Sequence, residues 1–406
     1  MLVAMAWRNL WRQPRRTVLS LFSIAFTGAL LVFILSFQIG VYAQMTETTL
    51  RLFDGYAQIQ PQGYADDPDI HRVIASPDVL RAAILRVPGV DAAAPRVNTF
   101  AIVAYGQRSY GAMVVGIDPA SEIKVSTIAA DIRQGRYLRP LDDDAAIVGE
   151  TLARNLGLSV GEKITLLGSA LDGSVAADVL RVAGVFRSGI PEIDRNLLEM
   201  PLARAQNTFG LGGRTTTIAI SGATLTTIQG ALPALRSLGR KHGVVLQDWG
   251  ALQPALRDSI TLKYITSSLL YATLVTVVAF IILNTLLMSA LERTHEFGVL
   301  LAIGMRPSRI GRMVWLEQII LALAGCAIGI AIGAAVTLWF ARQGIVYSGL
   351  QDVLKQYGVP TRLYPSLSLF SALAGPGAIA LAICAGGLVP YLHVRRLEAA
   401  SAMRAA

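Results

Sequence analysis

Four long stretches of this 406-residue chain contain no aspartate, glutamate, lysine or arginine. They run from Thr17 to Thr46, Tyr264 to Leu291, Gln318 to Ala341 and Leu363 to Leu392. Each is longer than the about 20 apolar residues that cross a hydrocarbon core of about 30 Å. Inside a bilayer the backbone polar groups must be satisfied within the segment, so each stretch is predicted to be a helix. The sequence therefore predicts transmembrane helices at residues 17–45, 264–291, 314–341 and 366–392.

The basic balance of the chain, a formal net charge of +9, is concentrated beside these helices. Residues 1–16, 292–312 and 393–406 together hold 11 basic and 3 acidic residues, whereas residues 42–263 hold 22 of each sign. Lysine and arginine gather in the short loops on the cytoplasmic side of a membrane. The pattern predicts cytoplasmic termini and a cytoplasmic loop 292–312, with residues 46–262 and the loop 342–364 outside. The positive charge thus indicates membrane topology rather than nucleic-acid binding.

The N-terminal residues 1–16 have the composition of a helix that lies in the headgroup plane. Trp7 and Trp11 suit the interface, and Arg8 and Arg12 can reach phosphates. The alternative is a basic flank with no helix of its own. The apolar run that follows is longer than the 7–15 residues typical of a signal peptide, so the first transmembrane helix is expected to be a retained anchor.

Residues 46–262 change to short segments rich in β-branched and aromatic residues, separated by turns, and predict a large α+β domain outside the cytoplasm. The expected strands are 56–60, 97–105, 110–117, 145–148, 163–167, 179–186, 215–221 and 244–247. The expected helices are 77–87, 151–156, 201–209 and 226–242. A strand-rich subdomain is expected to be inserted at about residues 117–193.

No catalytic, cofactor or metal site is predicted. The chain has no Gly-Lys dipeptide, hence no P-loop for nucleotide phosphates, and its four histidines are far apart in the sequence. The acidic run Asp142–Asp144 could hold a cation but is typical of a solvated turn. These features favour a protein that is not itself an enzyme.

Two features of the third predicted helix leave alternatives open. Gly325, Gly329 and Gly333 recur every fourth residue, which lets helices approach closely in lipid. This glycine face could form an oligomer interface or pack within one bundle. Glu317, at the start of the helix, could lie at the membrane interface or pair with an arginine of the inner loop such as Arg312.

The loop 292–312 has the pattern of a short amphipathic helix from Glu292 to Gly304. Acids begin it, apolar residues follow, Gly304 provides a stop and Pro307 lies beyond. It contains Arg293-Thr294-x-Glu296-Phe297-Gly298, then Ala302-Ile303-Gly304. This resembles the Arg-Thr-x-Glu-Ile-Gly-x-x-x-Ala-Ile-Gly pattern of the permease family that includes MacB-type macrolide exporters, lipoprotein-releasing permeases and the division protein FtsX, with Phe297 in place of isoleucine.

Two other segments are similar to the same family. The opening Ala6-x-Arg8-Asn9-Leu10, followed by Arg16-Thr17, matches its N-terminal pattern, and residues 156–162 match its Leu-Gly-Leu-x-x-Gly-Asp pattern with Glu162 in place of aspartate. The tail 393–406 matches only loosely, because the proline of the family's tail is missing. One helix, one large outer domain and then three helices is itself the family's arrangement.

The resemblance implies a MacB-like periplasmic core domain and a multi-pass permease in the bacterial inner membrane. It further implies a dimer with a second copy or a paralogue, and ABC ATPase subunits that are separate chains. ATP hydrolysis would then push on a coupling helix and move a lipoprotein, peptide or other amphiphile by mechanotransmission. The residues expected in this helix are Glu292, Arg293, Thr294, Glu296, Phe297, Gly298, Leu301, Ala302 and Gly304.

Within that helix, Glu296 is expected to meet a basic groove on the ATPase, and Phe297 and Leu301 are expected to fill a pocket there. The alternative is a helix that only packs beneath the membrane. Two alternatives for the function also stay open. One is an FtsX-like scaffold that activates a cell-wall hydrolase, and the other is a drug or peptide efflux permease.

Overall fold

The computed structural model describes residues 2–12, 14–346, 349, 362–388 and 391–392. These residues form two compact units, which are described separately. The helical unit is built from residues up to Ala43 and from residues 260–346 and 362 onward, and the α/β domain from residues 44–259. The predicted tail 393–406 and most of the predicted loop 342–364 lie outside the described residues.

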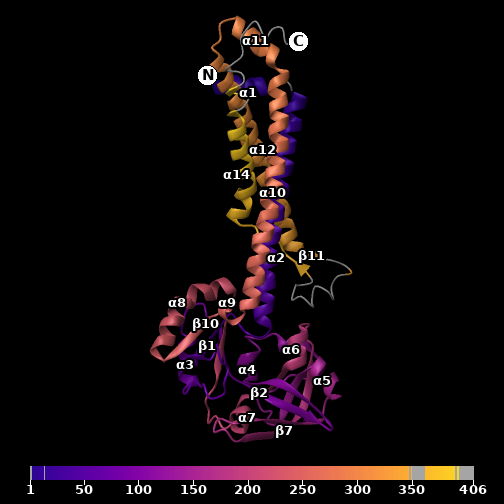
Figure 1. Ribbon diagram of the computed structural model, residues 1–406, viewed down its shortest axis with the longest axis vertical. Coiled ribbons are helices and arrows are strands. Elements are labelled where there is room, and N and C mark those ends of the chain that lie inside the picture. The colour runs from indigo at the N-terminus through magenta and orange to yellow at the C-terminus, as the bar shows by residue number, and fades with distance from the viewer. Residues whose placement is uncertain (1, 13, 347–348, 350–361, 389–390, 393–406) are drawn as a thin grey trace. The chain divides into compact units, whose positions relative to one another are not determined.

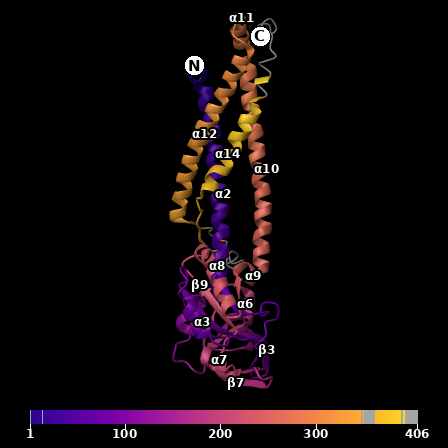
Figure 2. The same ribbon diagram turned by 90° about the vertical axis from the view of Figure 1, so that its left-hand side faces the viewer.

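Four helices of the chain are long and apolar enough to cross a membrane. The helical elements of this unit, some of which run side by side in Figures 1 and 2, are α1 (Leu2–Leu10), α2 (Pro14–Leu52), α10 (Pro254–Glu292), α11 (Thr294–Ala302), α12 (Pro307–Gln343) and α14 (Leu369–Gly386). A short antiparallel pair, β11 (Ile345–Val346) and β12 (Arg362–Leu363), also belongs to it. The long helices α2, α10 and α12 contain the predicted segments 17–45, 264–291 and 314–341 and extend beyond them, whereas α14 covers residues 369–386 of the predicted segment 366–392. Apolar content marks the part of a helix that suits lipid, whereas the helix itself continues until a breaker stops it.

The helix starts follow from local chemistry. Three of the four long helices begin at a proline, Pro14, Pro254 or Pro307, whose fixed φ and missing N–H suit the first turn. The fourth, α14, begins with a capping box in which Ser368 and Ser371 exchange hydrogen bonds between side chain and backbone.

The three glycines of the third long helix lie against the first long helix of the same chain. A Cβ atom on Gly329 would stand 2.7 Å from the carbonyl oxygen of Ala25, and one on Gly333 would stand 2.8 Å from that of Ala29. A Cβ on Gly325 would meet Ile24 at 2.6 Å. Any larger side chain would therefore force α12 away from α2.

The α/β domain is a mixed sheet with helices on its faces. Its strands are β1 (Ala57–Pro61), β2 (Ala92–Tyr105), β3 (Arg108–Ile117), β4 (Ile132–Gly135), β5 (Ala145–Gly149), β6 (Lys163–Ser169), β7 (Val175–Phe186), β8 (Leu197–Pro201), β9 (Thr217–Ser221) and β10 (Val244–Asp248). Its helices are α3 (Pro77–Ile84), α4 (Pro119–Glu122), the 3₁₀ turn η1 (Ile128–Asp131), α5 (Glu150–Leu156), α6 (Pro191–Asn196), α7 (Leu202–Thr208), α8 (Leu225–Lys241) and α9 (Trp249–Leu252).

Six of the strands pair in a closed ring. The order is β2, β3, β8, β5, β7, β6 and back to β2, with β3–β8 and β5–β7 parallel and the other pairs antiparallel. At the start of β2, residues 92–96 pair with β9 on the same edge that pairs with β6 farther along, and the sheet continues from β9 through β1 to β10. Every predicted strand has a counterpart in this sheet.

Residues 117–193 were expected to form an inserted, strand-rich subdomain. The strands of that range join the same sheet as β2 and β3, because β2 pairs with β6 from Ala101 to Ala104. One hydrophobic core of the ring includes residues from Ile70 to Leu211, another is formed by β3, β5, β7 and β8, and a third lies beneath β1, β9 and β10 with α3 and α8. The composition of the segment predicts strands, but the pairing of strands that are distant in the sequence determines which of them share a core.

The last turn of α2 lies within the α/β domain, which supplies partners for its exposed carbonyls. The last C=O groups of a helix accept no hydrogen bond from an N–H of the same helix, so they need donors from elsewhere. Five consecutive carbonyls here accept hydrogen bonds, from the N–H of Gly55 to Leu50, the N–H of Thr127 to Arg51, the hydroxyl of Ser126 to Leu52, the guanidinium of Arg96 to Phe53 and the amide of Gln58 to Asp54.

Arg96 belongs to a cluster of charges that is completely buried. Its guanidinium donates to both carboxylate oxygens of Glu122, at 3.0 and 2.5 Å, and lies 4.5 Å from the centroid of the Phe53 ring. A second buried carboxyl, Glu199, accepts a hydrogen bond from Tyr137 at 3.3 Å. Burial, together with the nearby carboxylate of Glu122, raises the pKa of Glu199 from its ordinary value of 4.5 to about 8.

We expect this carboxyl to give the domain a pH-dependent stability. Because the folded pKa of Glu199 is the higher one, the folded protein holds a proton that the unfolded chain loses, and stability falls as the pH rises from 4.5 to about 8. The contribution of one proton is at most about 1.4 kcal/mol per pH unit. Glu199→Gln should remove this slope in denaturant unfolding of the full-length protein in detergent. The same change at the exposed Glu192 should leave it intact, and an unchanged slope in Glu199→Gln would contradict the assignment.

Candidate functional site

The residues that the motifs single out gather at the end of the helical unit formed by α1, α11 and the start of α12. The helix of the loop is shorter than expected: α11 begins at Thr294 rather than at Glu292, which is the last residue of α10, and it ends at Ala302. Arg293 forms the break between the two helices and carries the N-cap position of α11. Gly304 follows with a φ of +93°, a conformation that glycine adopts readily.

Glu317 is the centre of a polar network in this region. Its side chain is 8% exposed. It accepts hydrogen bonds from the Asn9 amide of α1 and, at 2.8 Å, from the guanidinium of Arg293. Arg312, the partner considered from the sequence, instead donates to the Ser308 carbonyl. Glu317 therefore connects α1 and the residue before α11 to α12.

Arg293 lies between two carboxylates. Its Nε donates to Glu296 at 3.2 Å, while Nη1 reaches Glu317. The guanidinium also lies 5.5 Å from the centroid of the Phe297 ring. Burial disfavours the charge on Arg293, but the two carboxylates outweigh that effect and raise its pKa. The motif Arg-Thr-x-Glu thus builds a charged contact that fixes the start of α11.

Phe297, expected to fill a pocket on a partner, is buried within its own chain. Its side chain is 1% exposed and packs against Ile310 and Val314 of α12. Leu301 is half-buried against the same cluster. The apolar side of α11 faces its own chain because burial there removes these side chains from water without requiring a second protein.

Two apolar residues that sequence reasoning did not select form the outer side of α11 and its C-terminal turn. Val299 is 45% exposed and Ile303 is 74% exposed. They lie four residues apart, so they share one helix face. The 3.6-residue period places Val299 and Ile303 on the face opposite Phe297 and Leu301, but it does not say which of the two faces is covered. Glu296, with a side chain 44% exposed, remains accessible beside its ion pair.

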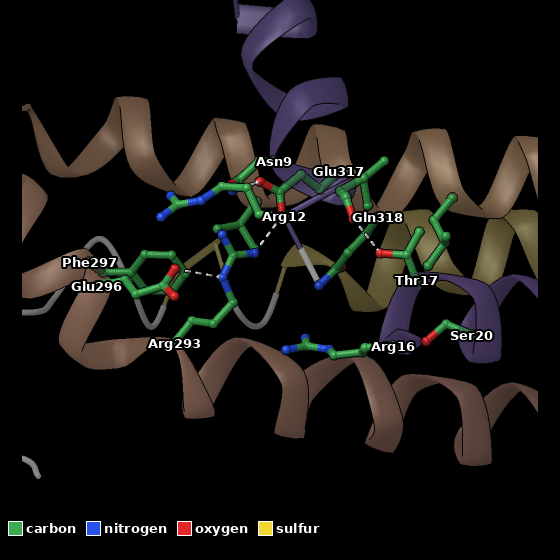
Figure 3. Close-up of a pocket in the computed structure, with 13 residues that line it drawn as sticks. Asn9, Arg12, Arg16, Thr17, Ser20, Arg293, Glu296, Phe297, Glu317 and Gln318 are labelled. Atoms are coloured by element: carbon green, nitrogen blue, oxygen red, sulfur yellow. Dashed lines mark hydrogen bonds and ion pairs between the residues drawn. The ribbon is translucent and has the colours of Figure 1, made fainter. Parts of the chain in front are cut away.

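A cavity of about 250 Å³ opens between α1, the start of α2, α11 and α12. Figure 3 shows three arginines around it, Arg12, Arg16 and Arg293, with Thr17 and Ser20 of α2 on another side. Trp7 of α1 and Trp11, directly after this helix, are about half exposed and pack edge to face. Of the four residues expected at the membrane interface, Arg12 is the one that lines the cavity.

One segment of the α/β domain has the residue spacing of a catalytic serine motif. Residues Gly157 to Gly161 fit the Gly-x-Ser-x-Gly spacing of a hydrolase nucleophile elbow. Such an elbow joins a strand to a following helix, whereas here α5 precedes the segment and β6 follows it. The N–H of Ser159 donates to the carboxylate of Glu162, which also accepts from the Tyr105 hydroxyl. The serine therefore belongs to a turn that fixes Glu162.

Comparison with known proteins gives two family matches that together cover most of the chain. Residues 17–235 match the family described as MacB-like periplasmic core domain, and residues 268–399 match the FtsX-like permease C-terminal family. The lipoprotein-releasing system transmembrane protein LolC of Xylella fastidiosa (strain Temecula1) is 24% identical over 405 residues, which cover 95% of this chain and 92% of that protein.

Two further relatives concern MacB. The macrolide export ATP-binding/permease protein MacB of Shewanella sp. (strain ANA-3) is 24% identical over 336 residues, 79% of this chain and 48% of that protein. The crystal structure of the periplasmic region of MacB from Actinobacillus actinomycetemcomitans aligns with a TM-score of 0.36 and 16% identity over 50% of this chain and 91% of that structure.

The Glu317 network predicts a specific weakness at α1. Glu317→Gln removes the charge that Arg293 and Asn9 face, and a hydrogen bond to a charged group contributes about 2 kcal/mol. We expect backbone amides of Leu2–Leu10 to exchange with deuterium roughly thirtyfold faster in this variant. Glu296→Gln removes the more exposed partner of Arg293 and should change the exchange far less. Equal effects of the two substitutions would contradict the central position of Glu317.

Proposed function

This chain belongs to the family of FtsX-like permeases with a MacB-like periplasmic core domain, and we propose that it is the permease subunit of an ATP-driven transporter that releases lipoproteins or similar amphiphiles from the bacterial inner membrane. The match to the lipoprotein-releasing protein LolC supports this substrate class, since it extends over nearly the full length of both chains. The MacB relative is named as an ATP-binding/permease protein, and the match to this chain covers 48% of its length. In the proposal the ATPase is a separate subunit, the termini are cytoplasmic and the α/β domain is periplasmic.

The observation that carries the proposal is the anchorage of α2 in the α/β domain. Five successive carbonyls accept hydrogen bonds from donors of that domain, three at the end of α2 and two directly after it, and one of the donors is the buried Arg96. The start of α10 is held at the same place, because Gln253 donates to the Asp54 carboxylate at 2.7 Å. Two membrane helices that are fixed in this way would transmit a rotation or a shift to the domain, which is what mechanotransmission requires.

At the other end of the helical unit, α11 is the proposed contact with the ATPase. Its inner side is fastened by Phe297 and by the Arg293–Glu317 ion pair, so a force on α11 would reach α12. Its outer side presents Val299 and Ile303, two exposed apolar residues that suit a pocket on a partner. The proposed docking face therefore consists of Glu296, Val299 and Ile303, with Phe297 and Leu301 as internal supports.

We further propose that a second permease copy packs on α10. In its most apolar stretch 6% of the residues are buried within the chain, against 28–33% for the other three long helices. Four apolar residues of α10 are each more than 60% exposed, and every spacing between them is three, four or a sum of threes and fours: Leu262, Ile265, Leu269 and Phe280. Such a stripe suits the seam between two helices, whose partner would be the same helix of the second copy.

The docking face can be tested with one charge substitution. Ile303→Asp should weaken co-purification of the cognate ATPase by roughly thirtyfold, since a central apolar contact at an interface contributes about 2 kcal/mol or more. Val175→Asp, at a position of similar exposure (78%) on the α/β domain, is the matched control and should have no effect. If Ile303→Asp retains the ATPase and full stimulation of ATP hydrolysis, α11 is not the coupling element. Capture of a cell-wall hydrolase without lipoprotein release would favour the regulatory alternative.

The dimer can be tested by cross-linking in native membranes. In a background with Cys326→Ala and Cys384→Ala, we expect Leu269→Cys on α10 to form a disulfide-linked dimer on mild oxidation. Leu323→Cys, which is 59% exposed on α12, should remain monomeric. Equal cross-linking at both positions would indicate random collision, and no cross-linking at positions along the α10 stripe would place lipid there instead.

A further inference from the structure

We propose that α14 is a hinged helix that bends at Gly375-Pro376-Gly377, so that its second half moves relative to its first half. The hinge is a property of the helical unit alone. Its use in transport rests on the proposed function, whereas the bend itself can be measured without any transport.

The three residues at this point have the weakest backbone of α14. Pro376 lies inside the helix, lacks the N–H that would donate to the carbonyl of Ala372, and crowds that carbonyl with its ring. Glycine on either side lowers the helix propensity further, because it loses more backbone freedom on folding than any other residue. Sharp bends in helices occur at such positions. Since α14 nevertheless continues to Gly386, its neighbours must hold it there.

The first half of α14 is fastened to α2 and α10. The completely buried hydroxyl of Ser371 accepts a hydrogen bond from Ser36 of α2 at 2.9 Å. At Gly375, the hydroxyl of Tyr271 from α10 fills the space that a Cβ atom would need, and such a Cβ would also stand 2.7 Å from that of Leu31 on α2. Tyr271 in turn donates to the Leu31 carbonyl at 3.4 Å. These contacts fix the first half up to Gly375.

The second half of α14, in contrast, makes its hydrogen bonds to α12. The indole N–H of Trp315 donates to the carbonyl of Cys384 at 3.0 Å, and the thiol of Cys326 donates to the carbonyl of Pro376 at 3.3 Å. The two isoleucines of this half are completely buried in an apolar cluster with residues of α2 and α12. Apolar contacts have no fixed direction, so the hydrogen bonds associate the second half with α12.

The surroundings of the bend leave room for movement. A Cβ atom on Gly377 would meet no atom within 4 Å. The ring of Pro376 lies near a surface of glycine backbone: a Cβ on Gly28 of α2 would stand 3.9 Å from the ring and 3.6 Å from the Cα of Gly329 on α12. Glycines present no side chains that would interlock with the ring, so the ring can turn against this surface.

In the proposed transporter, the hinge would let α12 move without carrying all of α14. A force on α11 reaches α12 through Phe297 and the Arg293–Glu317 ion pair. The second half of α14 would follow α12, while the first half would stay with α2 and α10. Hinged movements of this kind depend on a few residues that absorb the change in φ and ψ. An uninterrupted α14 would tie α12 to α2 and α10 and resist the movement.

The alternative is a fixed bend, in which packing holds α14 at one angle. Hydrogen–deuterium exchange on the full-length protein in detergent separates the two. We expect the amides of residues 377–380 to exchange at least about tenfold faster than those of residues 329–333, a segment of α12 that has two glycines but no proline. Pro376→Ala restores the missing donor and should slow exchange at 377–380 by about tenfold or more.

A second variant tests the glycine of the hinge. Gly377→Ala fits without a close contact and should slow exchange at residues 377–380 by about two- to fivefold, the factor that corresponds to the helix preference of alanine over glycine. Gly230→Ala is the matched control, because a Cβ atom on this glycine of α8 would also meet no atom within 4 Å. It should leave the exchange of α14 unchanged.

A distance measurement without the proline variant guards against its misfolding. In a background with Cys326→Ser, which keeps a donor for the Pro376 carbonyl, and Cys384→Ala, spin labels are placed at the exposed positions Leu373→Cys or Leu381→Cys of α14. Each is paired with Leu270→Cys on α10, and the labelled protein is diluted with unlabelled protein. Electron paramagnetic resonance should give a narrow distance distribution for the first-half label and a broader one for the second-half label.

The outcomes separate the hinge from its use. Equal widths of the two distance distributions, or exchange at residues 377–380 as slow as at 329–333, would overturn the hinge. Unchanged lipoprotein release by Pro376→Ala would overturn its use in transport. Absence of release by the unmodified permease would count against the proposed function alone, since neither exchange nor distances depend on a substrate.

Discussion

The end of a membrane helix has unpaired carbonyls, and much of this structure depends on how those of α2 are satisfied. Within the bilayer the helix satisfies its own backbone, but its last turn must find donors elsewhere. The α/β domain provides them from a loop, from a strand and from the buried Arg96. Arg96 can do so because Glu122 is buried with it, and a buried guanidinium without a carboxylate would destabilise the domain. The end of α2 and the core of the domain are therefore stabilised by the same residues.

A second buried arginine with carboxylate partners lies at the start of α12, and this cluster is less deeply buried. In both places one arginine faces two carboxylates: Arg96 with Glu122 and the nearby Glu199, and Arg293 with Glu317 and Glu296. The first cluster is inaccessible to water, and its hydrogen bonds fix the end of α2 in the domain. The second has one partner, Glu296, that is 44% exposed, so its bond can be exchanged for one to another protein at small cost. The difference fits a fixed attachment at one place and a contact open to regulation at the other.

The four helices and most strands could be predicted because their signals are local. Uncharged length marks a membrane helix, and β-branched runs mark β1, β3 or β7 irrespective of the rest of the chain. The short strand β8, Leu197–Pro201, was missed because it lies in the sheet between β3 and β5 and contains Glu199, a charge that reads as surface. The partner of Glu317 was missed for a related reason: Asn9 is 308 residues away in the chain, and no local pattern records such a contact.

At the candidate site, the sequence singled out the segment 292–304, but the side of its helix that the structure buries is the one expected to face a partner. The motif led to Phe297 as the exposed anchor because aromatic residues are common at interfaces. In the structure the largest side chain is internal, and the smaller Val299 and Ile303 are outside. Which face of a short helix is covered depends on its neighbours, here Ile310 and Val314 of α12, and periodicity alone does not give that information.

The closed ring of six strands has a further consequence for encounters with other proteins. A sheet offers unpaired N–H and C=O groups only at its edges, and these are where a foreign strand can add or where copies of a protein can stick together. In the sheet described, both edges are short: β4 has four residues and an irregular register, and β10 has five. A foreign strand therefore finds little free backbone on this sheet, and contacts with other proteins are left to its side-chain surfaces.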